Sequence, residues 1–136
     1  MRSIGPMTAA ILCLAGCSGQ QSTAAGESAL ADFHKRLNAG HIEAIYSDSS
    51  TEMKGSTTDR RLTALLEAVH RKLGLFKSGS SAGWNHNYTL NGEFLAIVYN
   101  ADYERGKAQE SFVYHIVGGS AKLAGYHVNS DALILN

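Results

Sequence analysis

The chain has 136 residues, a length typical of one domain, and its 12 Lys and Arg residues balance its 12 Asp and Glu residues. No basic stripe is present to neutralise phosphates, so a nucleic-acid partner is excluded. The six His residues include no pair at the helical spacing of a zinc motif. A Ser nucleophile elbow and a Gly-rich phosphate loop are missing too. We therefore assign no catalytic residue, no metal and no cofactor.

The N-terminus has the pattern of a secretory signal. Arg2 gives a positive start, residues 7–15 form a short apolar run, and small residues follow. The run is well short of the ~20 residues that a membrane-spanning helix needs. We therefore expect residues 1–16 to be a signal peptide.

The end of this run, Leu14-Ala15-Gly16-Cys17, resembles the lipobox of bacterial lipoproteins. The resemblance implies that Cys17 becomes the first mature residue and carries acyl chains, which anchor stably when several are present. Ser18 rather than Asp favours the outer membrane, facing the periplasm, under the enteric sorting rule. Two alternatives are a secreted protein with an incidental cysteine, and a redox or metal pair of Cys13 with Cys17. Lipid anchoring in the cell envelope is the prediction.

Small polar residues fill 17–27, which predicts a flexible tether before one domain at 28–136. Apolar residues at helical spacing predict helices over 28–39 and 42–47, with one further turn near Met53. The clearest helix lies between the capping residues 56–58 and Gly74.

Turn signals then divide the chain into strands. Asn91-Gly92, Arg105-Gly106 and Gly118-Gly119 are typical of two-residue hairpin turns. They predict four antiparallel strands, at about 75–90, 93–104, 107–117 and 120–130.

Two-residue turns also predict which side chains share a face. The expected core face carries Trp84, His86, Tyr88, Leu95, Ile97, Tyr99, Tyr103, Phe112, Tyr114, Ile116 and Leu123. The expected outer face carries Phe94, Ala96, Val98, Asn100, Asp102, Gln109, Ser111, Val113, His115, Lys122, Ala124, Tyr126 and Val128. In this register Glu110 lies opposite His127 on the core face.

The fold class is therefore α+β, with N-terminal helices packed on a curved four-stranded antiparallel meander. The helix-Gly-short-helix opening at 33–50 and the strands over 83–130 resemble the cystatin-like, nuclear-transport-factor-2-like superfamily, including bacterial envelope proteins of unknown function. That superfamily contains isomerases, dehydratases and many non-enzymatic binders. Its enzymes imply an inward Asp or His base. No Asp is inward in this register, which argues against an enzyme.

A candidate ligand pocket lies in the expected cone between helices and sheet. Its residues are Trp84, Tyr99, Tyr103, Glu110 and His127. Aromatic walls with a carboxylate beside an imidazole are typical of small-molecule sites and of proton transfer. The alternative is a surface ion pair of little energetic value.

A candidate interface lies on the outer face. Its residues are Val98, Val113, Ala124, Tyr126 and Val128. Exposed apolar area of this kind indicates a partner surface, and the resemblance implies a homodimer. The preferred hypothesis is a lipid-anchored, non-enzymatic interaction or self-association module, and the alternative is a small-ligand binder.

Overall fold

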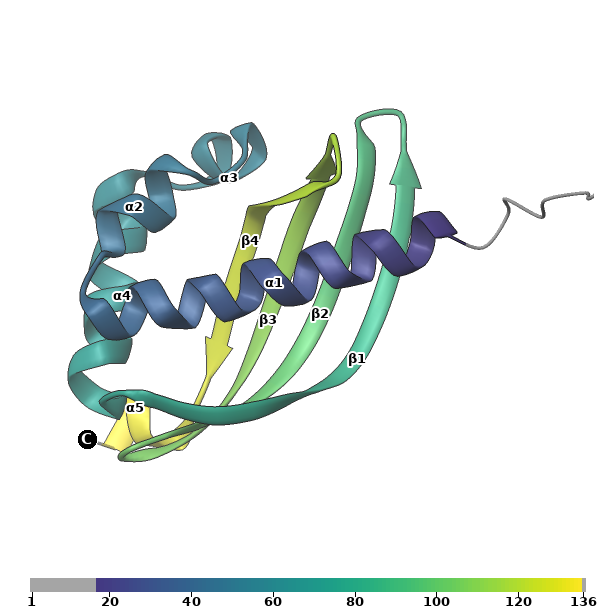
Figure 1. Ribbon diagram of the computed structural model, residues 1–136. Coiled ribbons are helices and arrows are strands. Elements are labelled where there is room, and N and C mark those ends of the chain that lie inside the picture. The colour runs from purple at the N-terminus through teal and green to yellow at the C-terminus, as the bar shows by residue number, and fades with distance from the viewer. Residues whose placement is uncertain (1–16, 136) are drawn as a thin grey trace, which may run out of the picture.

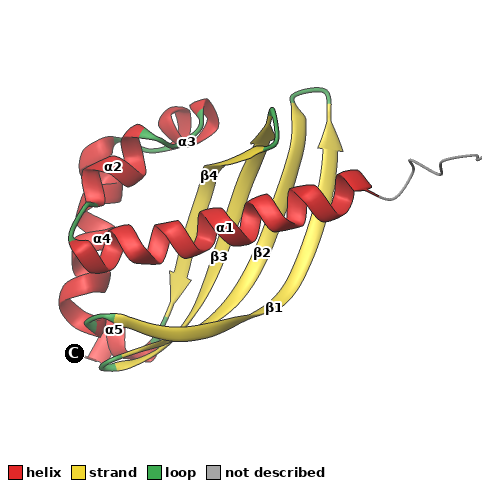
Figure 2. Ribbon diagram, viewed as in Figure 1, coloured by secondary structure: helices red, strands yellow, loops and turns green. Residues whose placement is uncertain are grey.

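The computed structural model describes residues 17–135, in which helices precede a four-stranded antiparallel sheet (Figures 1 and 2). The elements are α1 (Cys17–Ala39), α2 (Ile42–Ser47), α3 (Thr51–Ser56), α4 (Asp59–Leu73), β1 (Phe76–Thr89), β2 (Gly92–Tyr103), β3 (Gly106–Val117), β4 (Ser120–Asn129) and α5 (Asp131–Leu135). The strand order is β1-β2-β3-β4. This arrangement confirms the α+β class and the predicted order of elements. The expected signal peptide, 1–16, lies outside the described residues.

Helix α1 is longer than predicted, because the expected tether at 17–27 is helical. Ser22 and Gly26 are buried and continue the stripe of Leu30, Phe33 and Leu37 towards the N-terminus. These two small residues let the helix approach the sheet closely, and a Cβ atom at Gly26 would overlap a buried strand side chain. The flexible-tether prediction was therefore wrong, since small residues here serve packing rather than flexibility.

The shorter helices follow the predicted order, with α3 supplying the turn expected near Met53. Helix α4 begins after Thr58, whose hydroxyl accepts a hydrogen bond from the Arg61 amide at 3.2 Å. It ends at Gly74, where φ is 77°. Its buried stripe faces the core and consists of Leu62, Leu66, Val69 and Leu73.

The first two hairpin loops lie one residue earlier than predicted. They are Leu90-Asn91 and Glu104-Arg105, whereas Gly118-Gly119 is where the sequence indicates. Moving a two-residue loop by one position shifts the strand pairing by two. Trp84 therefore pairs with Ile97 instead of Tyr99, but the side chains of β2 and β3 keep their predicted faces.

A β-bulge changes the faces of β4. Tyr114 pairs with Leu123 and Val113 pairs with Gly125, which leaves Ala124 as the extra residue. Beyond this point every side chain of β4 is on the face opposite to the one predicted. Tyr126 and Val128 consequently turn inward, and His127 turns outward.

Helix α1 crosses the face of the sheet and contacts all four strands, as Figure 1 shows. Asn38 fastens its C-terminal end to β1, since the amide accepts from the Phe76 N–H at 2.8 Å and donates to the Phe76 carbonyl at 3.0 Å. The core between helices and sheet contains Leu30, Phe33, Leu37, Ile42, Ile45, Met53, Leu62, Leu66, Val69, Leu73, Leu95, Ile97, Ala101, Tyr103, Ala108, Phe112, Tyr114 and Leu123. None of the helices in residues 17–135 is long and apolar enough to cross a bilayer.

Candidate functional site: a buried carboxylate with histidine and tyrosine partners

A carboxylate lies in the middle of the core beneath α1. Glu110 on β3 has an exposed fraction of 0%. The hydroxyl groups of Tyr103 and Tyr126 donate to its Oε1 at 2.6 and 2.7 Å. Its Oε2 lies 2.7 Å from Nε2 of His34 on α1. A buried charge persists only when hydrogen-bonded partners surround it, and this carboxylate has three.

His34 comes from α1 and is 2% exposed. Its ring stacks on Phe76 of β1, with centroids 3.7 Å apart and planes at 6°. An ionised carboxylate only accepts hydrogen bonds, so Nε2 carries the proton that points to Glu110. The other ring nitrogen, Nδ1, is buried and has no partner among the described residues. In the neutral ring this nitrogen is a free acceptor.

The tyrosines around Glu110 stay protonated. Burial, reinforced by the nearby Glu110 charge, raises the pKa of Tyr103 and the pKa of Tyr126 well above the usual range. The same two causes raise the pKa of Tyr99, which is less buried. Both hydroxyls that contact Glu110 therefore act as donors at every physiological pH.

A cavity of about 630 Å³ lies between α1 and the β1–β2 hairpin, beside this cluster. Leu30 and His34 from α1, Phe76 from β1 and Tyr99 from β2 form its largely apolar wall. The volume lies within the range of small-molecule sites. His34 thus belongs to both the buried cluster and the cavity wall.

The structure brings together three of the five predicted pocket residues. Tyr103 and Glu110 are in direct contact, and Tyr99 pairs with Glu110 across the β2–β3 ladder. Trp84 packs against the core but is not among the residues that line the cavity.

His127 is exposed on the outer face and pairs with Ser111, so the predicted Glu110–His127 couple is wrong. The cause is the bulge at Ala124, which places Val128 opposite Glu110, where a regular strand would place His127. A carboxylate–imidazole pair does exist, but its imidazole belongs to His34.

His34 and Phe76 were missed from the sequence. His34 lies within the apolar stripe of α1, next to Phe33 and three positions before Leu37, so its helical spacing already placed it on the buried face. That signal indicated burial but not a partner, because the contact joins residues 76 positions apart.

The candidate interface is smaller than predicted. Val98 remains on the outer face with 36% exposure, and Val113 and Ala124 are half-buried there. Tyr126 and Val128 belong to the core side instead, which corrects their assignment to the interface.

Across residues 17–135, no group of three His, Cys, Asp or Glu side chains is placed to hold a metal ion. The sequence matches no known family model and has no significant match among curated proteins.

Proposed function

We propose that this protein is a lipid-anchored component of the bacterial cell envelope that binds a small ligand in the cavity between α1 and the β1–β2 hairpin. The observation that carries the ligand-binding role is His34, a buried imidazole at the cavity wall. Its Nε2 contacts Glu110, and its Nδ1 has no hydrogen-bond partner among residues 17–135. A buried polar atom without a partner is costly, and a ligand group would satisfy it. The cystatin-like fold assignment is part of this proposal.

The chemistry of the wall indicates the class of ligand. Phe76, Tyr99 and Leu30 favour an apolar body. We propose that the ligand binds to the neutral form of His34, in which Nδ1 accepts from a single O–H group. We therefore expect a small aromatic or aliphatic alcohol or phenol. We propose binding rather than turnover, since the exposed wall of the cavity is largely apolar.

A blocking substitution tests this role without touching the buried cluster. Ala31 is an exposed residue of α1 at the cavity, and Ala31→Leu puts a larger side chain into the space. In titrations with phenol followed by NMR, we expect shifts at His34, Phe76 and Tyr99 in the mature protein, and their loss in this variant. Ala64→Leu, an exposed change on α4, is the matched control. Phenol binding that survives Ala31→Leu unchanged contradicts the proposal.

The envelope anchor rests on the lipobox resemblance at Cys17 and has its own test. Mass spectrometry of the mature protein from bacterial membranes is expected to find acyl groups on Cys17. Cys17→Ser is expected to abolish acylation and to leave the full-length precursor. An unmodified N-terminus at another residue would contradict the anchor while leaving the ligand site open.

Self-association through the outer sheet face is a second candidate function. Val98 is the observation that favours it, because it is 36% exposed between half-buried apolar neighbours. Val98→Asp is expected to convert a dimer to a monomer in analytical ultracentrifugation. A wild-type protein that is monomeric at high concentration removes this candidate.

A further inference from the structure

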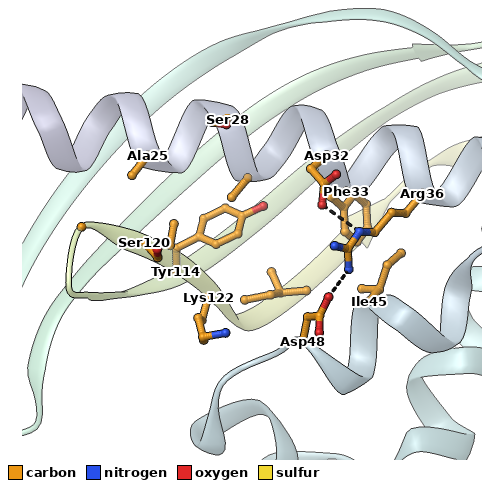
Figure 3. Close-up of a pocket in the computed structure, with 14 residues that line it drawn as sticks. Ala25, Ser28, Asp32, Phe33, Arg36, Ile45, Asp48, Tyr114, Ser120 and Lys122 are labelled. Atoms are coloured by element: carbon orange, nitrogen blue, oxygen red, sulfur yellow. Dashed lines mark hydrogen bonds and ion pairs between the residues drawn. The ribbon is translucent and has the colours of Figure 1, made fainter.

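A second cavity, of about 640 Å³, lies on the other side of α1 (Figure 3). Helices α1 and α2 and the β3–β4 hairpin line it. Its apolar wall consists of Phe33, Ile45 and Leu123, together with alanines of α1 and β4. The proposed function above makes no use of this space.

Tyr114 on β3 supplies the polar feature of this cavity. The side chain is 2% exposed, and its hydroxyl has no hydrogen-bond partner among the described residues. In Figure 3 the ring lies within the cavity with the hydroxyl turned towards α1. Burial raises the pKa of Tyr114, so the group stays protonated and can donate. A buried hydroxyl without a partner destabilises the free protein, and a bound oxygen atom would remove this penalty.

The charged groups of the wall are already matched to one another. Arg36 bridges two carboxylates, with Nε 2.7 Å from Asp32 Oδ2 and Nη1 2.6 Å from Asp48 Oδ2. These contacts, led by the hydrogen bond to Asp48, raise the pKa of Arg36. Lys122 is the second cation at the wall, so two positive charges balance two negative charges. A ligand with a net charge would gain no net electrostatic attraction from these four groups, and it would lie close to a wall group of its own sign.

We infer that this cavity is a second binding site, for an uncharged amphipathic molecule whose hydroxyl or carbonyl oxygen accepts a hydrogen bond from Tyr114. The apolar part of the molecule would pack against Phe33, Ile45 and Leu123. The site is separate from the His34 cavity. The direction of the proposed hydrogen bond is also reversed, since Tyr114 donates to its ligand whereas His34 Nδ1 accepts from its own.

The decisive substitution is Tyr114→Phe, which removes one oxygen atom and keeps the ring. Because the hydroxyl is unpartnered, we expect this variant to fold with an unchanged or higher melting temperature. The probe is hexanamide, titrated into the mature protein and followed by NMR shifts at Phe33, Ile45 and Leu123. We expect about tenfold weaker binding to the variant, the effect of one hydrogen bond. Tyr88→Phe, at an exposed tyrosine of β1, is the matched control and should bind as the wild type does.

Charged analogues complete the test. Hexanoate and hexylammonium are expected to bind at least tenfold more weakly than hexanamide. Equal hexanamide affinity for wild type and Tyr114→Phe would overturn the inference, as would tighter binding of either ion or the absence of shifts at this cavity. Ala31→Leu, which blocks the other cavity, should leave hexanamide binding unchanged, so failure of one site is distinguishable from failure of the other.

Discussion

The His34 imidazole of α1 and the Glu110 carboxylate of β3 lie 2.7 Å apart at the centre of the domain. This contact joins the long helix to the middle of the sheet through the interior rather than over the surface. Its strength depends on two tyrosine hydroxyls that hold the other carboxylate oxygen. The cluster therefore connects α1, β2, β3 and β4, and loss of any of its partners should lower the free energy of unfolding.

Glu110→Ala is expected to lower the free energy of unfolding by about 3 kcal/mol or more. The substitution leaves the donors of His34, Tyr103 and Tyr126 buried without an acceptor, and removing one partner of a buried pair is strongly destabilising. Urea unfolding at neutral pH measures the change. Glu67→Ala, an exposed change on α4, should stay within about 0.5 kcal/mol. Similar losses for both variants would show that the cluster does not form.

Tyr126 and His127 give a direct test of the bulge. Tyr126→Phe removes a hydrogen bond to a charged group and should cost about 1.5–3 kcal/mol. His127 is exposed on the other face, so His127→Ala should be close to neutral. A regular β4 strand would reverse this order. Thermal unfolding of the two variants side by side is sufficient to decide between the two registers.

Gly26 tests whether the first part of α1 is packed helix. Gly26→Val puts a branched side chain against buried Leu95 and should destabilise the protein by about 1–3 kcal/mol. Gly19→Ala is the control in the same helix, since no atom outside the helix backbone and the adjacent residues lies within 4 Å of the added Cβ. It should be neutral or stabilising by up to about 1 kcal/mol, because Ala favours a helix over Gly. A flexible segment at 17–27 would leave the stability of both variants at the wild-type value.

Acidification should weaken the contact between α3 and β3. The Ser50 hydroxyl, the Glu52 N–H and His115 lower the pKa of Glu52 below its ordinary value of 4.5. A carboxyl group whose pKa is lowered by folding stabilises the folded state at pH values above its ordinary pKa. This contribution is lost as the pH falls through the lowered pKa.

Glu52→Gln should therefore reduce the fall in the free energy of unfolding between neutral pH and about pH 3.5. The effect should be small, since Glu52 is partly exposed and water screens the interaction. Urea unfolding at both pH values measures it. Glu67→Gln should keep the wild-type pH dependence, and an identical slope for both variants would rule out the Glu52 contribution.

Local signals were sufficient for most of the architecture. The Gly74 helix end, the Thr58 cap and the three hairpins all follow from short-range chemistry, and the structure has each of them. Two hairpin loops were predicted one residue too late, but the predicted faces of β2 and β3 were still correct. A pairing shift of two residues preserves the alternation of side chains between the two faces.

The site was harder to predict because it depends on two features without a local signal. One is the bulge at Ala124, a small residue in an otherwise ordinary strand sequence. The other is the contact between His34 and Glu110, which requires the packing of α1 on the sheet to be known. Ser22 and Gly26 gave no sign of that packing, because a search for large apolar residues at helical spacing classes a segment of small residues as a linker.

The bulge also has a consequence for how this chain tolerates changes of length. Ala124 is unpaired, so a chain lacking it would keep every existing partner of β4, with Tyr126 still against Glu110. A one-residue deletion after Tyr126 cannot be absorbed in this way. Keeping the bulge would then move the later side chains of β4 to the opposite face, and removing it would turn Tyr126 away from Glu110. Length variation in β4 should therefore be confined to the bulge.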